Sequence, residues 1–550
     1  MTSAIDPLVP YAVAAQRRAL VVAGQQRIRR AARWLLCGPE GSAAWERPAL
    51  LVLLWMAAVL YLGNLGAAGW GNLPAAAAVQ AGTQNWTAFL YGSADAANSI
   101  TVGSPPAALW VMGLFARVVG LSAAGLLVPQ ALLGVASVAV LYATVRRGFD
   151  AGTALLAGVF FALAPAAASA FSSTAPDALL VLLGSLAVYF TLRGIETGSP
   201  RWVLWAGTMV GFGFLAAGLQ ALLLLPVLAG VYLVASPRML RDRCWHLLGA
   251  LVSGVVAAGW WVAIVELVPQ SWRPYIGGSR TNSFLEATFG DGALGRLLGE
   301  SPAWSTTISG VDLVLLIAVV LLVGGIGRVL LGRTPRGDAR RVLLVLGVGG
   351  LLVTTVAGTL VGGSLPSSLA IAQAPALAVT LAIGAGLLWQ GRDAEWARGT
   401  RVRIRAGATL VVWLALGAVL LGPGAATIQA LSATAATTAT AASRTSAVAA
   451  PEVVALLQDT APRYTWPAAT VGSETAALYQ LESGQPVMPV GGMFGSDPSP
   501  TLEKFIEYVG TGRVHYFIGG EDSSGSIAEW VAANYPAQTV GGVTLYNLGG

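Results

Sequence analysis

The sequence contains very little charge and a single lysine, Lys504. Only 11% of its 550 residues are charged, whereas 55% are hydrophobic, and the mean hydropathy is +0.68. Soluble globular domains carry about 25% charged residues, so this composition excludes an ordinary soluble enzyme. It predicts a polytopic membrane protein, because each helix that crosses the bilayer takes about 20 apolar residues. The net charge of +6 gives no indication of nucleic-acid binding.

Cysteines and metal-ligand patterns are also scarce. The two cysteines, Cys37 and Cys244, lie in arginine-rich segments that the charge pattern assigns to the cytosol, where disulfides are rare. No group of His, Asp and Glu residues has the spacing of a metal site, so the sequence predicts none. The first apolar run begins near Pro48, and no cleavable signal peptide is expected.

The apolar residues fall into eleven runs that are suited to membrane-spanning helices. These runs cover residues 48–66, 124–145, 152–171, 177–193, 202–217, 219–236, 246–266, 309–331, 342–362, 369–389 and 406–426. Arginines cluster in every second loop, and the positive-inside rule places such loops in the cytoplasm. We therefore expect the N-terminus inside and the C-terminus outside a bacterial plasma membrane.

That topology requires the segment 107–119 not to cross the membrane. The segment is short for a span and contains Arg117, which favours a helix lying on the outer surface. The alternative is a true short span, which would invert the orientation of everything after it.

The composition divides the chain into four parts. These are a cytoplasmic segment 1–47, a membrane module 48–426 with outer loops 67–123 and 267–307, an Ala/Ser/Thr-rich linker 427–450, and a soluble part 451–550. In the last part, strand patterns such as VHYFI alternate with helix patterns such as SETAALYQLESG. This alternation predicts a small parallel α/β sheet outside the cell. His515 lies in one of its strand patterns, where a packed histidine is a simpler interpretation than a catalytic one.

Several segments resemble the bacterial membrane glycosyltransferases of the GT-C type, the mannosyltransferases related to glycosyltransferase family 39 and to aminoarabinose transferases. The segments include AVQAGTQNWTAFLYGSADAANSITV, PPAALWVMGLFARVVGLS, WWVAIVELVPQSWRPYIGGSRTNSFLEATFG and GGMFGSDPSPTLEKFIEYV. The resemblance implies a helical membrane module of about 11 spans with an extracytoplasmic α/β domain. It also implies a sugar donor carried on polyprenyl phosphate. A carboxylate in an outer loop acts as base, and basic residues, sometimes with a divalent metal, hold the phosphate.

The sequence departs from that family where charged residues are expected. The family's charged positions are occupied by Leu73, Gly103, Ser104, Ser173 and Ala217, and its outer His-x-Tyr-Tyr motif is replaced at residues 365–368. Asp95 and Asp177 occupy positions that the family also fills with Asp, so we predict them as catalytic residues. Both could instead cap a turn or a helix.

Other polar residues of the outer loops are candidates for substrate or lipid binding. They are Gln220, Glu266, Arg273, Tyr275, Arg280 and Glu286. An arginine can bind a lipid phosphate in a bidentate manner, or can lie at the headgroups with its stem buried.

Two main functions remain open. The first is transfer of a hexose, of mannosyl type, from polyprenyl phosphate to an extracytoplasmic acceptor. The second is a non-catalytic role as partner of an active, paralogous glycosyltransferase, which the missing charges favour. A lipid-binding or transport role ranks last, because intramembrane charges and internal repeats are not evident.

Overall fold

The computed structural model describes residues 43–63, 69–290, 337–359, 367–390, 449–460, 463–520 and 525–549. The chain forms two compact units, Met1–Met56 and Ala57–Gly550. Helix α2 (Glu46–Leu62) begins within the first unit, and it occupies the first apolar run. The expected spans 309–331 and 406–426, and the linker up to residue 448, lie outside the described residues.

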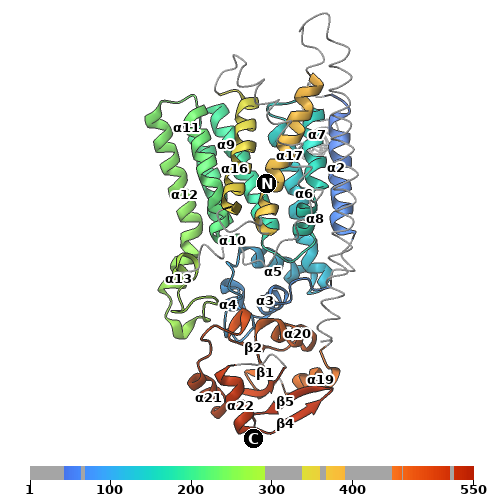
Figure 1. Cartoon of the computed structure of the whole chain (residues 1–550), viewed down its shortest axis with the longest axis vertical. Helices are drawn as coiled ribbons and strands as arrows, with labels where there is room; N and C mark the ends of the chain where they lie inside the picture. The colour runs from blue at the N-terminus through green and yellow to red at the C-terminus, as the bar shows by residue number, and fades with distance from the viewer. Residues whose placement is uncertain are drawn as a thin grey trace, which may run out of the picture. The chain divides into compact units, whose positions relative to one another are not determined.

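The helices of the second unit coincide with the apolar runs of the sequence (Figure 1). They are α6 (Ala123–Val145), α7 (Ala151–Ala162), α8 (Pro165–Phe171), α9 (Asp177–Thr197), α10 (Pro200–Ala217), η1 (Gly218–Leu224), α11 (Leu225–Ala235), α12 (Leu240–Leu267), α16 (Ala339–Thr359) and α17 (Ser367–Gln390). Among the described residues, four helical stretches are long and apolar enough to cross a membrane. The pair α7 and α8, bent by 66°, makes a fifth if it is one span. The protein is therefore a multi-pass membrane protein.

The longest of these stretches, Pro200–Ala235, turns back on itself. A straight helix of that length would measure about 54 Å, far more than the bilayer core of about 30 Å. At its two ends, Arg238 Nε donates a hydrogen bond to the carbonyl oxygen of Gly198 (2.9 Å). Both ends therefore lie on the same side, and the chain reverses at η1, where Gly218 has a φ of +60°. This agrees with the two separate runs expected from the sequence.

Glycines allow α10 and α12 to approach closely. A Cβ atom built on Gly207 would overlap the carbonyl oxygen of Ala250, and one on Gly211 would overlap that of Gly254. Small residues with this four-residue spacing are typical of contacts between membrane helices.

Short helices occupy the described parts of the two segments that the sequence predicts to be outer loops, here called the first and second outer loops. They are α3 (Leu73–Gln84), α4 (Trp86–Tyr91), α5 (Ala107–Val119), η2 (Gln270–Trp272) and α13 (Phe284–Phe289). Helix α5 has 13 residues, about 20 Å, which is too short to cross a bilayer unaided. The Arg117 guanidinium of α5 lies 3.5 Å from the Trp86 ring centre, and this cation–π contact holds α5 against α4.

The C-terminal part contains a sheet of five strands in the order β2-β1-β3-β5-β4 (Figure 1). The strands are β1 (Trp466–Val471), β2 (Val487–Val490), β3 (Val514–Ile518), β4 (Ala537–Val540) and β5 (Val543–Asn547), and the helices are α19 (Pro451–Thr460), α20 (Ser473–Ser483), η4 (Gly492–Phe494), α21 (Leu502–Gly510) and α22 (Ser526–Asn534). Strands β1, β2 and β3 are parallel, as expected. The expectation of a wholly parallel sheet is wrong, because β5 pairs antiparallel with both β3 and β4. The exposed edge strand β4 carries little apolar sequence and was not predicted.

Helix α20 packs against the first outer loop. Its Ala477 and Leu481 are buried in one apolar cluster with Ala77, Ile100 and Val102 of that loop. The C-terminal sheet and the outer loop therefore share part of their core.

Candidate functional site

A cavity of about 350 Å³ lies where the outer loops meet the ends of the long helices. Five segments form it: the first outer loop, the start of α9, the junction of α10 with η1, helix α12 through Trp261, and the second outer loop. The lining residues are Tyr91, Thr101, Gly103, Ser104, Pro105, Pro176, Asp177, Ala216, Ala217, Gly218, Leu219, Gln220, Trp261, Ile276, Gly277, Phe284, Ala287 and Thr288. Apart from one carboxylate, the polar groups are hydroxyls, an amide and an indole.

One wall of the cavity is made by two segments from different outer loops. Thr101 donates its backbone N–H to the Tyr275 carbonyl oxygen (2.8 Å), and Gly277 donates its N–H to Thr101 Oγ1 (2.9 Å). The contact requires glycine at 277, because a Cβ there would overlap the Thr101 carbonyl oxygen. The chain then turns at Gly103, which has a φ of +72°.

Asp177 is the carboxylate of the cavity. It is the first residue of α9, where the helix dipole favours a negative charge. Among the described residues that line the cavity, none is Arg, Lys or His. The site therefore offers a base that could accept a proton, and hydroxyl and amide groups that could bind sugar hydroxyls.

Several of the residues singled out from the sequence meet in this cavity. Gln220 lines it together with Asp177, and the substituted positions Gly103, Ser104 and Ala217 line it as well. Both Gly103 and Ser104 are exposed. Three of the places where the resemblance expects charge are thus at the cavity, and they carry none.

Asp95 has a different position from the one its predicted catalytic role requires. It is fully buried and does not line the cavity. Its Oδ1 accepts hydrogen bonds from the Ala97 N–H (2.9 Å) and from Trp466 Nε1 (3.0 Å). Its Oδ2 accepts from both the backbone N–H and the hydroxyl of Ser99. Burial raises the pKa of this carboxyl, and the hydrogen bonds oppose the rise. These contacts give Asp95 a structural position.

Arg273 lies behind the cavity wall. Its side chain is buried, and it donates to the Val268 carbonyl oxygen (3.2 Å), Asn282 Oδ1 (2.9 Å) and the Asn282 carbonyl oxygen (2.7 Å). Burial raises the pKa of Tyr91, a lining residue, and the positive charge of Arg273 opposes that rise. Arg273 therefore influences the cavity by its charge, although most of its side-chain contacts are within its own loop.

The remaining binding candidates hold the second outer loop together. Glu266 Oε1 accepts from the Ser283 hydroxyl and the Leu285 N–H (both 2.9 Å). Glu286 Oε2 accepts from the backbone N–H of Arg280 (2.8 Å), and the Tyr275 hydroxyl donates to the Ser279 carbonyl oxygen (2.7 Å). None of Glu266, Tyr275, Arg280 and Glu286 is among the lining residues.

The two other substituted positions, Leu73 and Ser173, lie close to each other outside the cavity lining. Asn72, which precedes Leu73, donates its N–H to Thr174 Oγ1 (2.8 Å) and caps α3 by accepting from the Ala75 N–H (2.9 Å). The segment 365–366 lies outside the described residues.

Sequence reasoning missed Tyr91, Thr101, Trp261 and Thr288 as lining residues. Trp261 donates its indole N–H to the Leu90 carbonyl oxygen (2.9 Å), which joins α12 to the first outer loop. Tryptophans near the ends of membrane helices are commonly anchors at the membrane–water interface, so the sequence gives no signal that Trp261 lines a cavity.

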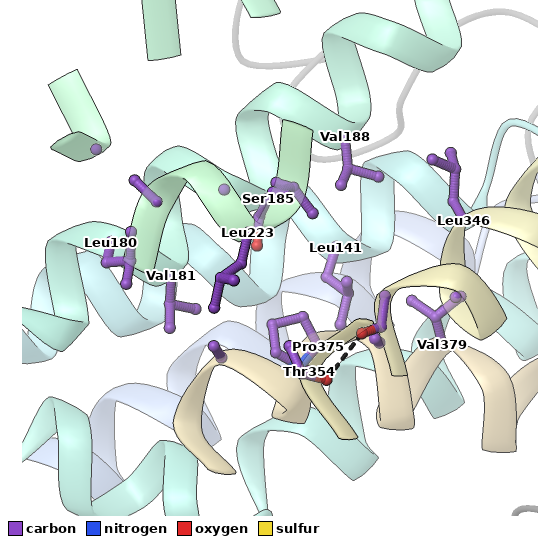
Figure 2. Close-up of a pocket in the computed structure, with 18 of the residues that line it drawn as sticks. Leu141, Leu180, Val181, Ser185, Val188, Leu223, Leu346, Thr354, Pro375 and Val379 are labelled. Atoms are coloured by element: carbon purple, nitrogen blue, oxygen red, sulfur yellow. Dashed lines mark hydrogen bonds between the residues drawn. The ribbon is translucent and has the colours of Figure 1, made fainter. Parts of the chain in front are cut away.

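A second, smaller cavity of about 130 Å³ lies among the long helices (Figure 2). Leucine and valine side chains of α6, α9, η1, α16 and α17 line it, among them Leu141, Leu180 and Val379. The Thr354 hydroxyl at its edge donates to the Gly350 carbonyl oxygen (2.8 Å), so its polarity is satisfied within α16. Gln220 lines both cavities, so the apolar cavity adjoins the larger cavity, which carries more polar groups, at this residue.

A divalent metal, which the resemblance allows, does not fit the donor set of the described residues. They contain no group of three or more His, Cys, Asp or Glu side chains close enough to hold a metal ion. A lone carboxylate such as Asp177 supplies too few ligands, so no step below involves a metal.

Comparison with known proteins gives matches to two families and to solved structures. Residues 103–262 match the family described as dolichyl-phosphate-mannose-protein mannosyltransferase, and residues 453–534 match "Putative mannosyltransferase YkcB-like, C-terminal". Two Bacillus subtilis (strain 168) proteins, named "Putative mannosyltransferase" YycA and YkcB, are 35% and 34% identical over 256 and 252 residues. Each match covers 46% of this chain but only 37% and 35% of the relative, little more than a third of its length.

The fold is similar to that of two solved proteins. ArnT from Cupriavidus metallidurans bound to undecaprenyl phosphate aligns with a TM-score of 0.55 at 16% identity, over 90% of this chain and 97% of that one. The archaeal oligosaccharyltransferase AglB from Archaeoglobus fulgidus, in complex with an inhibitory peptide and a dolichol-phosphate, aligns with a TM-score of 0.54 at 12% identity, over 86% and 69%. Together with the family matches, these likenesses confirm the resemblance to the GT-C type glycosyltransferases.

Proposed function

We propose that this chain takes a sugar carried on a polyprenyl phosphate and transfers it, as a hexose of mannosyl type, to an acceptor on the outer side of the membrane. The observation that carries the proposal is the pair of adjoining cavities that share Gln220. An almost wholly apolar cavity beside one that also presents a carboxylate, an amide and hydroxyls matches a ligand with a hydrocarbon tail and a sugar head. The similar ArnT structure contains undecaprenyl phosphate, and the similar AglB structure contains a dolichol-phosphate.

In the proposed reaction, Asp177 is the base. Its carboxylate takes the proton of an acceptor hydroxyl, and the acceptor oxygen forms a bond to the anomeric carbon of the sugar. The bond from that carbon to the phosphate oxygen breaks, and polyprenyl phosphate leaves with the electron pair. General-base catalysis of this kind contributes about 10²–10⁴ in rate.

Stabilisation of the departing phosphate is the weak part of the site. Four residues that line the cavity can donate hydroxyl hydrogen bonds: Tyr91, Thr101, Ser104 and Thr288. The buried Arg273 adds positive charge from behind Tyr91, and such a charge is effective in a site from which water is excluded. We therefore expect a slower reaction than in a glycosyltransferase whose cavity is lined by a lysine or an arginine.

Lipid binding can be tested by filling the apolar cavity. Gly184 lines it, and a Cβ there would meet only Leu224 at 3.8 Å, so Gly184→Leu places its side chain in the cavity. We expect this variant to lose undecaprenyl phosphate in native mass spectrometry. The matched control is Gly230→Leu in α11, where a Cβ would have nothing within 4 Å. Equal lipid occupancy in the two variants would contradict the assignment.

The second candidate is a non-catalytic subunit that binds the lipid-linked sugar beside an active glycosyltransferase. The observation that favours it is the lack of any Arg or Lys among the described lining residues. It predicts that a second glycosyltransferase chain co-purifies and that the isolated protein does not turn over. Turnover by the isolated chain would reject it.

A further inference from the structure

The cavity wall consists of two segments, residues 99–104 and 275–278, which few hydrogen bonds join to each other. Tyr275 donates its N–H to the Ser99 carbonyl oxygen (3.2 Å) and accepts from the Thr101 N–H (2.8 Å). Gly277 adds its bond to Thr101 Oγ1 (2.9 Å). The segments pair only through an isolated bridge between Ile100 and Tyr275. Residues 99–104 also pair with 92–94 of the same loop, where Val102 donates its N–H to the Gly92 carbonyl oxygen (3.2 Å) and Ala94 donates to that of Ile100 (2.8 Å). Such short pairings are marginally stable by themselves, so further contacts contribute to holding the wall.

The first such contact comes from strand β1. Trp466, the first residue of β1, donates its indole N–H to Asp95 Oδ1 (3.0 Å) across 371 residues of sequence. The other oxygen of Asp95 accepts from the backbone N–H of Ser99 (3.1 Å), where the wall begins. Trp466 is 2% exposed and Asp95 is 0% exposed. The Asp95 carboxylate therefore ties the start of the wall to the sheet through buried hydrogen bonds, which are the stronger kind when one partner is charged.

The second contact comes from the loop that follows β2. Asp497 Oδ2 accepts a hydrogen bond from the Gly278 N–H (3.0 Å), at the end of the wall in the second outer loop. In the same loop, a Cβ built on Gly492 would lie 3.0 Å from Ile100 Cδ1. The loop thus contacts both segments of the wall, one through a hydrogen bond and the other through packing.

The third contact comes from α20. Gln480, 3% exposed, donates from Nε2 to the carbonyl oxygens of Ala77 (3.0 Å) and Ala94 (2.9 Å). Its Oε1 accepts from the Val487 N–H of β2 (3.2 Å). A single buried amide therefore joins the sheet to α3 and to the turn that contains Asp95.

We infer that the C-terminal sheet positions the wall of the sugar cavity, with Asp95, Trp466, Gln480 and Asp497 as positioning residues. The sheet then contributes to ligand binding without lining the cavity itself. Asp95, which the sequence suggested as a catalytic residue, acts through the wall and does not touch the substrate. The inference takes the cavity as the site of the proposed function.

Hydrogen–deuterium exchange of the full-length protein in nanodiscs tests this inference. Trp466→Phe removes the indole donor and keeps an aromatic ring, and Asp497→Ala removes the acceptor for Gly278. We expect exchange in 99–104 and 275–278 to increase about tenfold in each variant, the effect of losing roughly 1.4 kcal/mol of local stability. Asp497→Asn, which keeps an acceptor oxygen, should restore protection.

Two matched controls separate positioning from general destabilisation. Trp530→Phe changes a tryptophan of α22 that packs against Phe505 of α21 and against Tyr535. Asp459→Ala changes an exposed carboxylate of α19. Both should leave the wall protected. If Trp466→Phe and Asp497→Ala also leave it protected, or if β3 loses as much protection as the wall, the inference is overturned.

Binding of undecaprenyl phosphate is measured on the same samples. Trp466→Phe and Asp497→Ala should bind the lipid about tenfold more weakly than the wild type does. The two control variants should bind it as tightly as the wild type does. If the wild type does not bind this lipid, the proposed function fails, whereas the exchange data still decide whether the sheet positions the wall.

Discussion

The replacement of Gly277 by alanine is a direct test of how closely the two outer loops must approach. The added Cβ would overlap the Thr101 carbonyl oxygen and lie 3.0 Å from the Gly103 nitrogen and 3.3 Å from the Gly103 Cα. Non-bonded heavy atoms prefer about 3.5 Å or more, so the segments must separate by about 1 Å. These three neighbouring atoms all belong to the backbone, so a rotamer change cannot relieve the overlap.

The cost of that separation follows from the contacts it breaks. The bond from the Gly277 N–H to Thr101 Oγ1, now 2.9 Å, would exceed hydrogen-bonding distance, at a cost of about 1 kcal/mol. Overpacking adds about 1–3 kcal/mol. We therefore expect Gly277→Ala to weaken undecaprenyl phosphate binding at least about tenfold, since each 1.4 kcal/mol is roughly a factor of ten.

The assay is lipid-dependent thermal stabilisation of the purified protein, because a ligand that binds only the folded state raises the melting temperature. Gly510→Ala is the matched control, since a Cβ there would have nothing within 4 Å. Gly277→Ala should lose most of the stabilisation by lipid, and Gly510→Ala should keep it. If Gly277→Ala binds the lipid as tightly as the wild type does, the close contact of the loops does not shape the binding site.

Further predictions concern charge and pH. Ser104→Lys adds a positive charge at the cavity lining and should tighten binding of the lipid phosphate about tenfold, in a salt-dependent manner. Gln538→Lys adds the same charge on the exposed edge strand β4 and should leave the affinity unchanged. If the two variants bind the lipid equally well, the phosphate does not bind near residue 104. His515 is 8% exposed, and burial lowers its pKa from the ordinary 6.5. The unfolded chain therefore binds the proton more readily than the folded protein does, and protection of β3 against exchange should decrease as the pH falls below about 6.5. The variant His515→Gln should show a weaker pH dependence. If its pH profile equals that of the wild type, His515 is not the titrating group.

The apolar runs predicted the long helices well, because the bilayer demands continuous apolar sequence whatever the tertiary contacts are. The reversal at η1 was also predictable, since the runs on either side of Gly218 are separate in the sequence. The antiparallel part of the sheet was not, because β4 is short and exposed and lacks the alternation on which strand prediction depends.

The candidate site was predictable only in part. Gly103, Ser104 and Asp177 could be placed at the cavity because the neighbouring segments resemble those of a known family. The position of Asp95 could not, because its partner Trp466 is 371 residues away. The role of Arg273 was also not predictable. Its charge suggested a phosphate-binding residue, but the sequence does not show that Asn282 accepts two of its hydrogen bonds.

The central claim is that the cavity transfers a sugar with Asp177 as base. The most direct measurement is the release of polyprenyl phosphate from polyprenyl-phosphate mannose by the purified chain, in nanodiscs that contain a bacterial membrane extract as the source of acceptors. We predict turnover by the wild type and a loss of about 10²–10⁴ in Asp177→Asn, with lipid binding retained. Equal turnover by Asp177→Asn, or no turnover by a wild type that binds the lipid, would contradict the claim.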